Sequence, residues 1–422
     1  MYIKFTILFL LLSSLLFGQT KSINPNVMPY ISKADSLNSI KSLTNDIKSV
    51  LSRDHIVQSN YGVCIYSLDR KEYVVNINED KALTPASITK LFTTFNALYN
   101  IGGKSTINTE IWYEDNDIAD KVINQNLYIV GNGDCLFSQK DIDTLFSVMY
   151  NAGIKEISGD ILIDLSHFDD ETSRFEYSGD DDVVANVGKI CPFSISRKTG
   201  VQAEKLILNS ISKNNIVFTG EFGECERPNY SSAKTLSVLT RFERPLIDIV
   251  NLTNKNSDNY LAEHLFKISA AVNKQYDRDY DKSRDLMFST LDKLNIDCKN
   301  CDINDGSGLS RRNRLTTKGI VGLLAAAEEL DFGKDFYNSL SIAGKDGTLR
   351  RRMQSTSAEN YVHAKTGTLR NASGLAGYVT SIDGERFAFA FVFNGYNVSN
   401  YKRTEDELAE LIAGFFYYNT IN

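Results

Sequence analysis

The sequence TPASITKLFT at residues 84–93 combines a helix start with two reactive side chains. Thr84 suits the N-cap and Pro85 the first helical position, and apolar residues follow with helical period. Ser87 and Lys90 are three residues apart, so their side chains share one face of that helix. First-turn amides lack an internal acceptor, so we expect the Ser87 N–H to face an oxyanion. The segment predicts a nucleophilic serine with a lysine base.

The predicted base must lose its proton before it can act. The helix N-terminus and a second cation would both lower the pKa of the Lys90 amine. A neutral amine can then take the proton of the Ser87 hydroxyl. The same S-x-x-K spacing recurs at serines that begin no comparable helix, and we assign them no catalytic role. These are Ser210, Ser231 and Ser399.

A second motif, Ser257-Asp258-Asn259, precedes a helical run and therefore lies near a helix terminus. One interpretation is a plain N-cap, because Asp and Asn commonly cap helices. The other is catalytic: these side chains would hydrogen-bond a substrate amide and relay a proton to the leaving amine. The presence of the other two motifs favours the catalytic interpretation, with Ser257 and Asn259 as site residues.

A third motif, Lys365-Thr366-Gly367-Thr368, lies beside strand-forming sequence. Gly367 allows a ligand to approach the backbone closely. We expect Lys365 and Thr366 to bind a carboxylate and the Thr368 N–H to be the second oxyanion donor. The same K-T-G letters at residues 198–200 precede the second motif, and we interpret them as a turn.

The residue pattern of 101–237 differs from that of the sequence on either side. Short strand-like runs alternate there with acidic and Asn/Gly-rich turns, and one helix is predicted over 139–151. The strand-like runs lie at 126–130, 159–164, 205–208 and 215–219. We interpret residues 101–237 as an inserted, mostly-β accessory domain.

The flanking regions, residues 24–100 and 238–422, are assigned to one discontinuous catalytic domain. Strands are predicted at residues 61–66, 73–77, 375–381 and 386–394, and helices within 245–272, 317–330 and 404–417.

The three motifs alone are typical of penicillin-binding proteins and class A β-lactamases. Longer segments around and between them resemble one family in particular. They resemble the class C penicillin-binding proteins, the D-alanyl-D-alanine carboxypeptidase/endopeptidase family. The segments are residues 84–93, 256–259, 305–310, 343–350, 363–369, 374–378 and 383–384. One departure is Cys135, where the family usually has proline.

The resemblance implies an α+β fold of the β-lactamase/transpeptidase type, with an antiparallel sheet flanked by helices and an insertion after the first motif. It also implies cleavage of peptidoglycan stem peptides through an acyl-enzyme on Ser87, with β-lactams as covalent inhibitors and no cofactor. Residues 305–310 read as a tight turn, with a part in the site wall as the alternative.

Two other functions stay open. In a β-lactamase of class A, a glutamate drives deacylation, usually in an E-x-x-x-N pattern, and none lies between Ser257 and Lys365. A β-lactamase or esterase of the same fold is one alternative. A non-catalytic cell-wall-binding protein is the other, although all three motifs are intact.

The N-terminus predicts export. Lys4 precedes an apolar run from Phe5 to Phe17, which is short for a membrane span and typical of a signal peptide. We place the signal peptide at residues 1–19; an N-terminal membrane anchor is the alternative. We expect a periplasmic or secreted protein whose mature chain has no stable membrane insertion.

The net charge and the cysteine and histidine patterns bear on which partners and metals the protein could bind. The formal net charge is -7, which disfavours nucleic acid as a partner. Cys298 and Cys301 form a C-x-x-C pattern that fits a disulfide loop, a redox pair or half of a zinc site. The four histidines are scattered without an H-E-x-x-H pattern, so we expect no metal.

Overall fold

The computed structural model describes residues 33–114, 118–119, 121–168, 188–226, 236–272 and 280–417. The chain divides into two units, residues 1–42 with 417–422, and residues 43–416. The predicted signal peptide lies outside the described residues. All strands and the elements that position the candidate site belong to the second unit.

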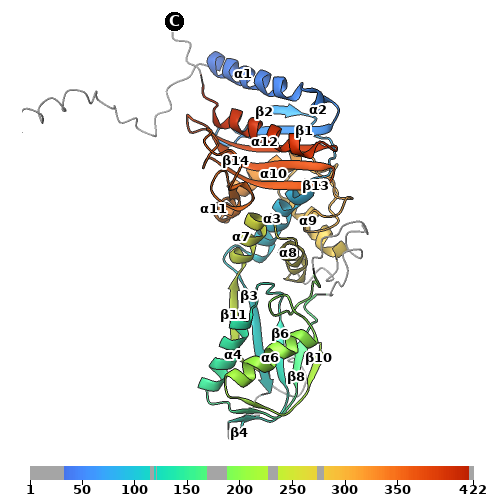
Figure 1. The fold of residues 1–422 in the computed structure, drawn as a ribbon, viewed down its shortest axis with the longest axis vertical. Helices are drawn as coiled ribbons and strands as arrows, with labels where there is room; N and C mark the ends of the chain where they lie inside the picture. Colours follow the sequence, from blue (N-terminus) through green and yellow to red (C-terminus); the bar gives the residue numbers. More distant parts are fainter. Residues whose placement is uncertain are drawn as a thin grey trace, which may run out of the picture. The chain divides into compact units, whose positions relative to one another are not determined.

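A six-stranded antiparallel sheet forms the centre of the region that carries the three motifs (Figure 1). Almost every residue of its central strand β15 is buried. Both faces of the sheet are therefore covered, since successive side chains point to opposite faces. In spatial order the strands are β12 (Ser341–Ile342), β13 (Val362–Leu369), β14 (Ala372–Thr380), β15 (Arg386–Asn394), β1 (Asn60–Ser67) and β2 (Glu72–Ile77).

Helices cover this sheet as the fold prediction requires. Helix α10 (Thr317–Glu328) packs on β15 and β1, and α12 (Val398–Ala413) packs on β14. Further helices share one apolar core with the sheet, in which Phe92, Phe95 and Leu265 are buried. They are α3 (Thr89–Ile101), α7 (Leu246–Asn256), α8 (Asn259–Val272), α9 (Tyr280–Lys293) and α11 (Gly333–Ser339). The predicted antiparallel sheet flanked by helices is confirmed.

The chain between Thr106 and Pro245 contributes a second sheet and a second apolar cluster, and its last strand runs past the predicted boundary at residue 237. Its five strands are β10 (Phe222–Cys225), β8 (Ile161–Asp164), β6 (Leu127–Gly131), β3 (Thr106–Glu114) and β11 (Leu236–Pro245). A smaller sheet contains β4 (Ile118–Ala119), β5 (Val122–Ile123), β7 (Glu156–Ile157) and β9 (Val217–Phe218). Among its described residues the region also contains the helices α4 (Gln139–Asn151) and α6 (Val201–Lys213), which pack on each other (Figure 1).

Helix α4 has the predicted bounds, but the strand predicted at residues 205–208 is wrong, because that segment lies inside α6. Three consecutive apolar residues there fit a strand and a buried helix face equally well. The assignment of residues 101–237 to a separate domain stays a prediction.

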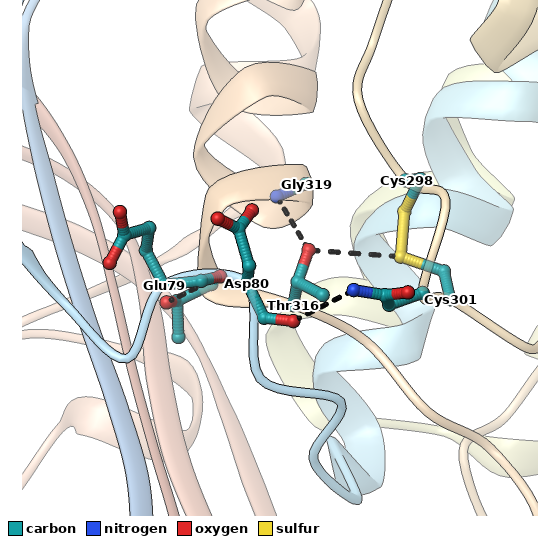
Figure 2. The surroundings of a disulfide bond; sticks show 8 residues. Glu79, Asp80, Cys298, Cys301, Thr316 and Gly319 are labelled. Atoms are coloured by element: carbon teal, nitrogen blue, oxygen red, sulfur yellow. Dashed lines mark hydrogen bonds between the residues drawn. A yellow bond between two sulfur atoms is a disulfide. The ribbon is translucent and has the colours of Figure 1, made fainter.

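Cys298 and Cys301 form a disulfide, as one interpretation of the C-x-x-C pattern predicted. The disulfide lies beside Thr316, the N-cap of α10, whose hydroxyl accepts a hydrogen bond from the Gly319 N–H (Figure 2). The loop is also tied to the segment after β2, because the Asn300 amide donates to the backbone carbonyl of Asp80. The disulfide therefore supports the start of a helix that covers the main sheet.

No helix in the described part of the chain is both long and apolar enough to cross a membrane.

Candidate active site

Ser87 lies in a single 3-10 turn, Ala86–Ile88, that leads into α3. The regular helix therefore begins later than predicted, at Thr89, and Thr84 does not cap it; the Thr84 hydroxyl instead accepts a hydrogen bond from Arg314. Ala86 has a positive φ of 50°, which costs energy in a residue with a side chain. This strained residue directly precedes the candidate nucleophile, which is partly exposed.

Lys90 is fully buried, and its amine lies at the centre of a hydrogen-bonded cluster. The amine donates to the Ser307 carbonyl at 2.6 Å, to Asn259 Oδ1 at 2.7 Å and to Ser87 Oγ at 2.9 Å. Contact between the first and second motifs is thus direct.

Burial lowers the pKa of Lys90 to about 8. The nearby carboxylates of Asp305, Glu263 and Asp258 act in the opposite direction. The predicted lowering is present, and its main cause is loss of hydration rather than the helix terminus or a second cation. A pKa near 8 leaves a useful fraction of neutral amine near neutral pH.

The second motif joins two helices. Ser257 has left-handed backbone geometry at the end of α7, and Asn259 begins α8. Asp258 accepts a hydrogen bond from the Leu261 N–H, so it caps α8 as one interpretation predicted. The side chains on either side of Asp258 point to the two lysines: Asn259 contacts Lys90, and the Ser257 hydroxyl accepts a hydrogen bond from Lys365 at 2.8 Å.

The third motif lies on β13, which packs against the turn that contains Ser87. A side chain at Gly367 would place its Cβ 2.5 Å from the Pro85 carbonyl oxygen, so only glycine fits this contact. Lys365 is fully buried, and burial together with the Lys90 charge holds its pKa well below the usual range. Thr366 donates to the Thr348 hydroxyl at 2.9 Å, and Thr368 is exposed.

The arrangement of these motifs agrees with comparisons to known proteins. The model of the D-Ala-D-Ala carboxypeptidase 3 (S13) family matches residues 43–197 and 193–414. The chain belongs to this family.

Relatives of this S13 chain include named carboxypeptidases. The D-alanyl-D-alanine carboxypeptidase of Actinomadura sp. (strain R39) is 26% identical over an alignment that covers 88% of this chain and 85% of that protein. The crystal structure of penicillin-binding protein 4 from Haemophilus influenzae is 21% identical, with a TM-score of 0.72 over 88% of this chain and 99% of that one. A penicillin G-acylated predatory endopeptidase from Bdellovibrio bacteriovorus is 17% identical, with a TM-score of 0.56 over 86% of this chain and 94% of that one.

The S13 chain also brings residues to the site that sequence reasoning missed. The Ser307 carbonyl contacts Lys90, and the buried carboxylates of Glu263 and Asp305 lie close enough to influence its pKa. For Asp305 and Ser307 the signal was the resemblance of residues 305–310 to the family, although the sequence alone explained that segment as a turn. Glu263 lies outside every segment that carried the resemblance.

The segment between the first and second motifs of the S13 chain contacts the second motif. Arg197 pairs with Asp258 and lies over the Tyr260 ring, and the Ser194 hydroxyl lies 3.0 Å from the Tyr260 hydroxyl. The first turn of α8 is therefore held from outside the main sheet.

The other motif copies lie in different surroundings. Ser210 is buried within α6 and donates to Asp143. Ser399 lies in the first turn of α12, so the prediction that it begins no comparable helix is wrong, but Ser399 is exposed and Lys402 is not buried. The K-T-G copy forms the predicted turn, since Lys198 pairs with Ile195 and Gly200 precedes α6. Ser231 lies outside the described residues.

Proposed function

We propose that this protein is a serine D-alanyl-D-alanine carboxypeptidase that cleaves peptidoglycan stem peptides through an acyl-enzyme on Ser87. One observation carries the proposal. A buried lysine with a lowered pKa lies 2.9 Å from the Ser87 hydroxyl, and side chains of all three motifs meet at Lys90 and a second buried lysine. Family membership and the named carboxypeptidase relatives support the substrate class.

In the first step, neutral Lys90 takes the hydroxyl proton and Ser87 Oγ attacks the carbonyl carbon of the penultimate D-alanine. The backbone N–H groups of Ser87 and Thr368 stabilise the oxyanion that forms. Lys365 and Thr366 bind the terminal carboxylate. These roles agree with the position of β13 against the turn that contains Ser87.

Collapse of the tetrahedral intermediate breaks the peptide bond and requires a proton on the leaving amine. The Ser257 hydroxyl lies 2.8 Å from the Lys365 amine and supplies that proton in our proposal, with Lys365 replacing it. Water then attacks the ester carbonyl and passes a proton through Ser257 to Lys365, while Lys90 returns its proton to Ser87 Oγ and the shortened peptide leaves. When the leaving amine belongs to a neighbouring stem peptide, the same steps cleave a cross-link. The endopeptidases of Bdellovibrio bacteriovorus among the structural neighbours support this second substrate.

Labelling with penicillin tests the nucleophile. A β-lactam amide resembles the D-Ala-D-Ala amide, so Ser87 should open it and keep the product attached. Intact mass spectrometry should show one added penicilloyl group, which maps to the peptide that contains Ser87. Ser87→Ala should abolish the adduct, whereas Ser210→Ala and Ser399→Ala should retain it. An adduct on another serine would contradict the site assignment.

Turnover separates the alternatives. A carboxypeptidase releases D-alanine from a D-Ala-D-Ala peptide and is inhibited by penicillin, because the opened ring stays tethered and blocks water. Rapid turnover of penicillin would favour a β-lactamase, and binding of peptidoglycan without either reaction would favour a wall-binding protein.

We also propose that the protein is exported to the periplasm or the medium and that residues 1–19 are removed. N-terminal sequencing of the mature protein should find a new terminus near Gly18 or Gln19. An intact Met1 on a membrane-bound product would contradict cleavage.

A further inference from the structure

Glu263 is a fully buried carboxylate one helical turn after Asn259 on α8. Its two oxygens accept hydrogen bonds from consecutive backbone amides, those of Gly306 at 3.0 Å and Ser307 at 2.9 Å. The Tyr280 hydroxyl also donates to it, at 3.1 Å. A buried charge is costly unless hydrogen bonds replace its hydration, and here these bonds come chiefly from one loop.

The same loop is held from its other sides. The Asp305 carboxylate, also buried, accepts from the Gly308 N–H at 2.7 Å. The Thr93 hydroxyl, one turn after Lys90 on α3, donates to the Gly306 carbonyl at 2.7 Å. The peptide units around Ser307 are therefore fixed, and so is the direction of the Ser307 carbonyl.

That carbonyl matters because of how a neutral amine forms hydrogen bonds. Without its extra proton, the Lys90 nitrogen has two hydrogens and one lone pair. The Ser307 carbonyl at 2.6 Å and Asn259 Oδ1 at 2.7 Å accept both hydrogens. The lone pair then faces the remaining neighbour, the Ser87 hydroxyl at 2.9 Å.

We propose that Glu263 is a positioning residue for acylation: it holds the Ser307 carbonyl so that the Lys90 lone pair faces Ser87. This inference rests on the proposed function. In the step concerned, the Ser87 O–H bond breaks, its proton forms a new N–H bond on Lys90, and the Oγ electron pair attacks the substrate carbonyl carbon. Glu263 itself exchanges no proton with the substrate.

The charge of Glu263 provides a second, separable effect. Glu263, Asp305 and Asp258 all favour the protonated form of Lys90, and the Lys365 amine is close enough for the Lys90 charge to lower its pKa. Removing one of these negative charges should lower the pKa of Lys90 below about 8. Burial and the nearby Asp305 carboxylate raise the pKa of Glu263 to about 7. Tyr280 also lies beside Glu263, and its ring is 4.8 Å from the Lys267 amine.

The experiment measures the acylation rate constant with penicillin as a function of pH, beside the melting temperature. Glu263→Gln keeps the shape but offers only one oxygen and no charge. Its plateau rate should fall by roughly 100-fold, a typical contribution of a positioned base, and the rise of the rate should move to lower pH. Glu385→Gln is the control. Glu385 is also buried, and its carboxylate accepts a hydrogen bond from the Ser67 hydroxyl. It follows the end of β14 that lies far from Thr368. It should acylate like the wild type.

Two milder variants separate geometry from charge. Glu263→Asp keeps the charge but withdraws the oxygens from the loop, so the plateau should fall while the pH midpoint stays. Tyr280→Phe removes one hydrogen bond that lowers the pKa of Glu263. More Glu263 is then protonated near neutral pH, so the rate should fall there and recover at higher pH. If Glu263→Gln does not fold, the pH dependence of the Tyr280→Phe acylation rate tests the inference in its place.

Two results with Glu263→Gln would overturn the inference. The first is a plateau acylation rate and a pH midpoint that equal those of the wild type. The second is a midpoint that moves up toward the usual 10.5, because that is the effect of a loosened site that admits water. A wild-type protein that takes up no penicillin would overturn the proposed function, and the inference with it.

Discussion

The guanidinium of Arg197, in the segment between the first and second motifs, pairs with the carboxylate of Asp258, the central residue of the second motif. Asp258 also caps α8, the helix that begins with Asn259. An exposed ion pair contributes only about 0–1 kcal/mol to stability. In this site the ion pair instead helps to orient Asn259, which contacts Lys90.

The first prediction follows from this pair. Arg197→Ala should slow acylation by penicillin several-fold, with little change in melting temperature, because the first turn of α8 loses a contact. Arg241→Ala is the matched control. Both arginine side chains are about half exposed, at 49% and 47%, and Arg241 pairs with Glu110 within the second sheet. Equal rates for the two variants would mean that the contact with Arg197 does not orient the second motif.

The second prediction concerns the base. Acylation requires neutral Lys90, so its rate should rise with pH and level off above about 8. Lys90→Arg keeps a positive charge that is not lost at any accessible pH. The variant should lose acylation by at least about 100-fold and show no rise at that pH. Near-normal labelling of a folded arginine variant would exclude Lys90 as the base.

The third prediction concerns stability. Burial lowers the pKa of Lys90 from 10.5 to about 8, so the folded state binds this proton less tightly than the unfolded chain. The resulting cost is absent above 10.5 and complete below about 8. At about 1.4 kcal/mol per pKa step, it amounts to about 3 kcal/mol.

Lys90→Met removes this titration. The free energy of unfolding of the wild type, minus that of the variant, should therefore increase by up to about 3 kcal/mol as pH rises from about 8 to 10.5. Denaturant titrations of both proteins across this range measure the difference. A difference independent of pH would mean that the pKa of Lys90 is not lowered.

The fourth prediction uses a close approach in the loop beside Ser87. Gly308 has a φ of 82°, and a Cβ there would lie 2.0 Å from the Ala86 carbonyl oxygen. Gly308→Ala should therefore displace the strained residue before the nucleophile, and lower both the melting temperature and the acylation rate.

Gly384→Ala is its control. Gly384 has a similar φ of 90°, but a Cβ there meets no atom within 4 Å. It should lose only the backbone cost of left-handed geometry, about 1–2 kcal/mol, and acylate normally. If both glycine variants label at the same rate, the contact with Ala86 has no effect on the site.

Much of the fold and part of the site could be predicted from local sequence. Strand β15 has the predicted bounds because its apolar run between polar ends fits a strand buried on both faces. The spacing of Ser87 and Lys90 places them together within one turn and the start of a helix, whatever the rest of the chain does. Where local sequence was ambiguous, as at residues 205–208, the prediction was wrong.

The surroundings of Lys90 were decided only by the tertiary structure. A backbone carbonyl such as that of Ser307 has no sequence signature, and it reaches Lys90 from 217 positions away along the chain. Burial, which sets the pKa of Lys90, depends on how α3, α8 and the loop at residues 305–308 pack together. The sequence by itself therefore predicted Ser87 and Lys90 as the reacting pair, because their spacing is local. Folding decided how they are held and charged, because hydration and hydrogen bonding depend on neighbours distant in the chain.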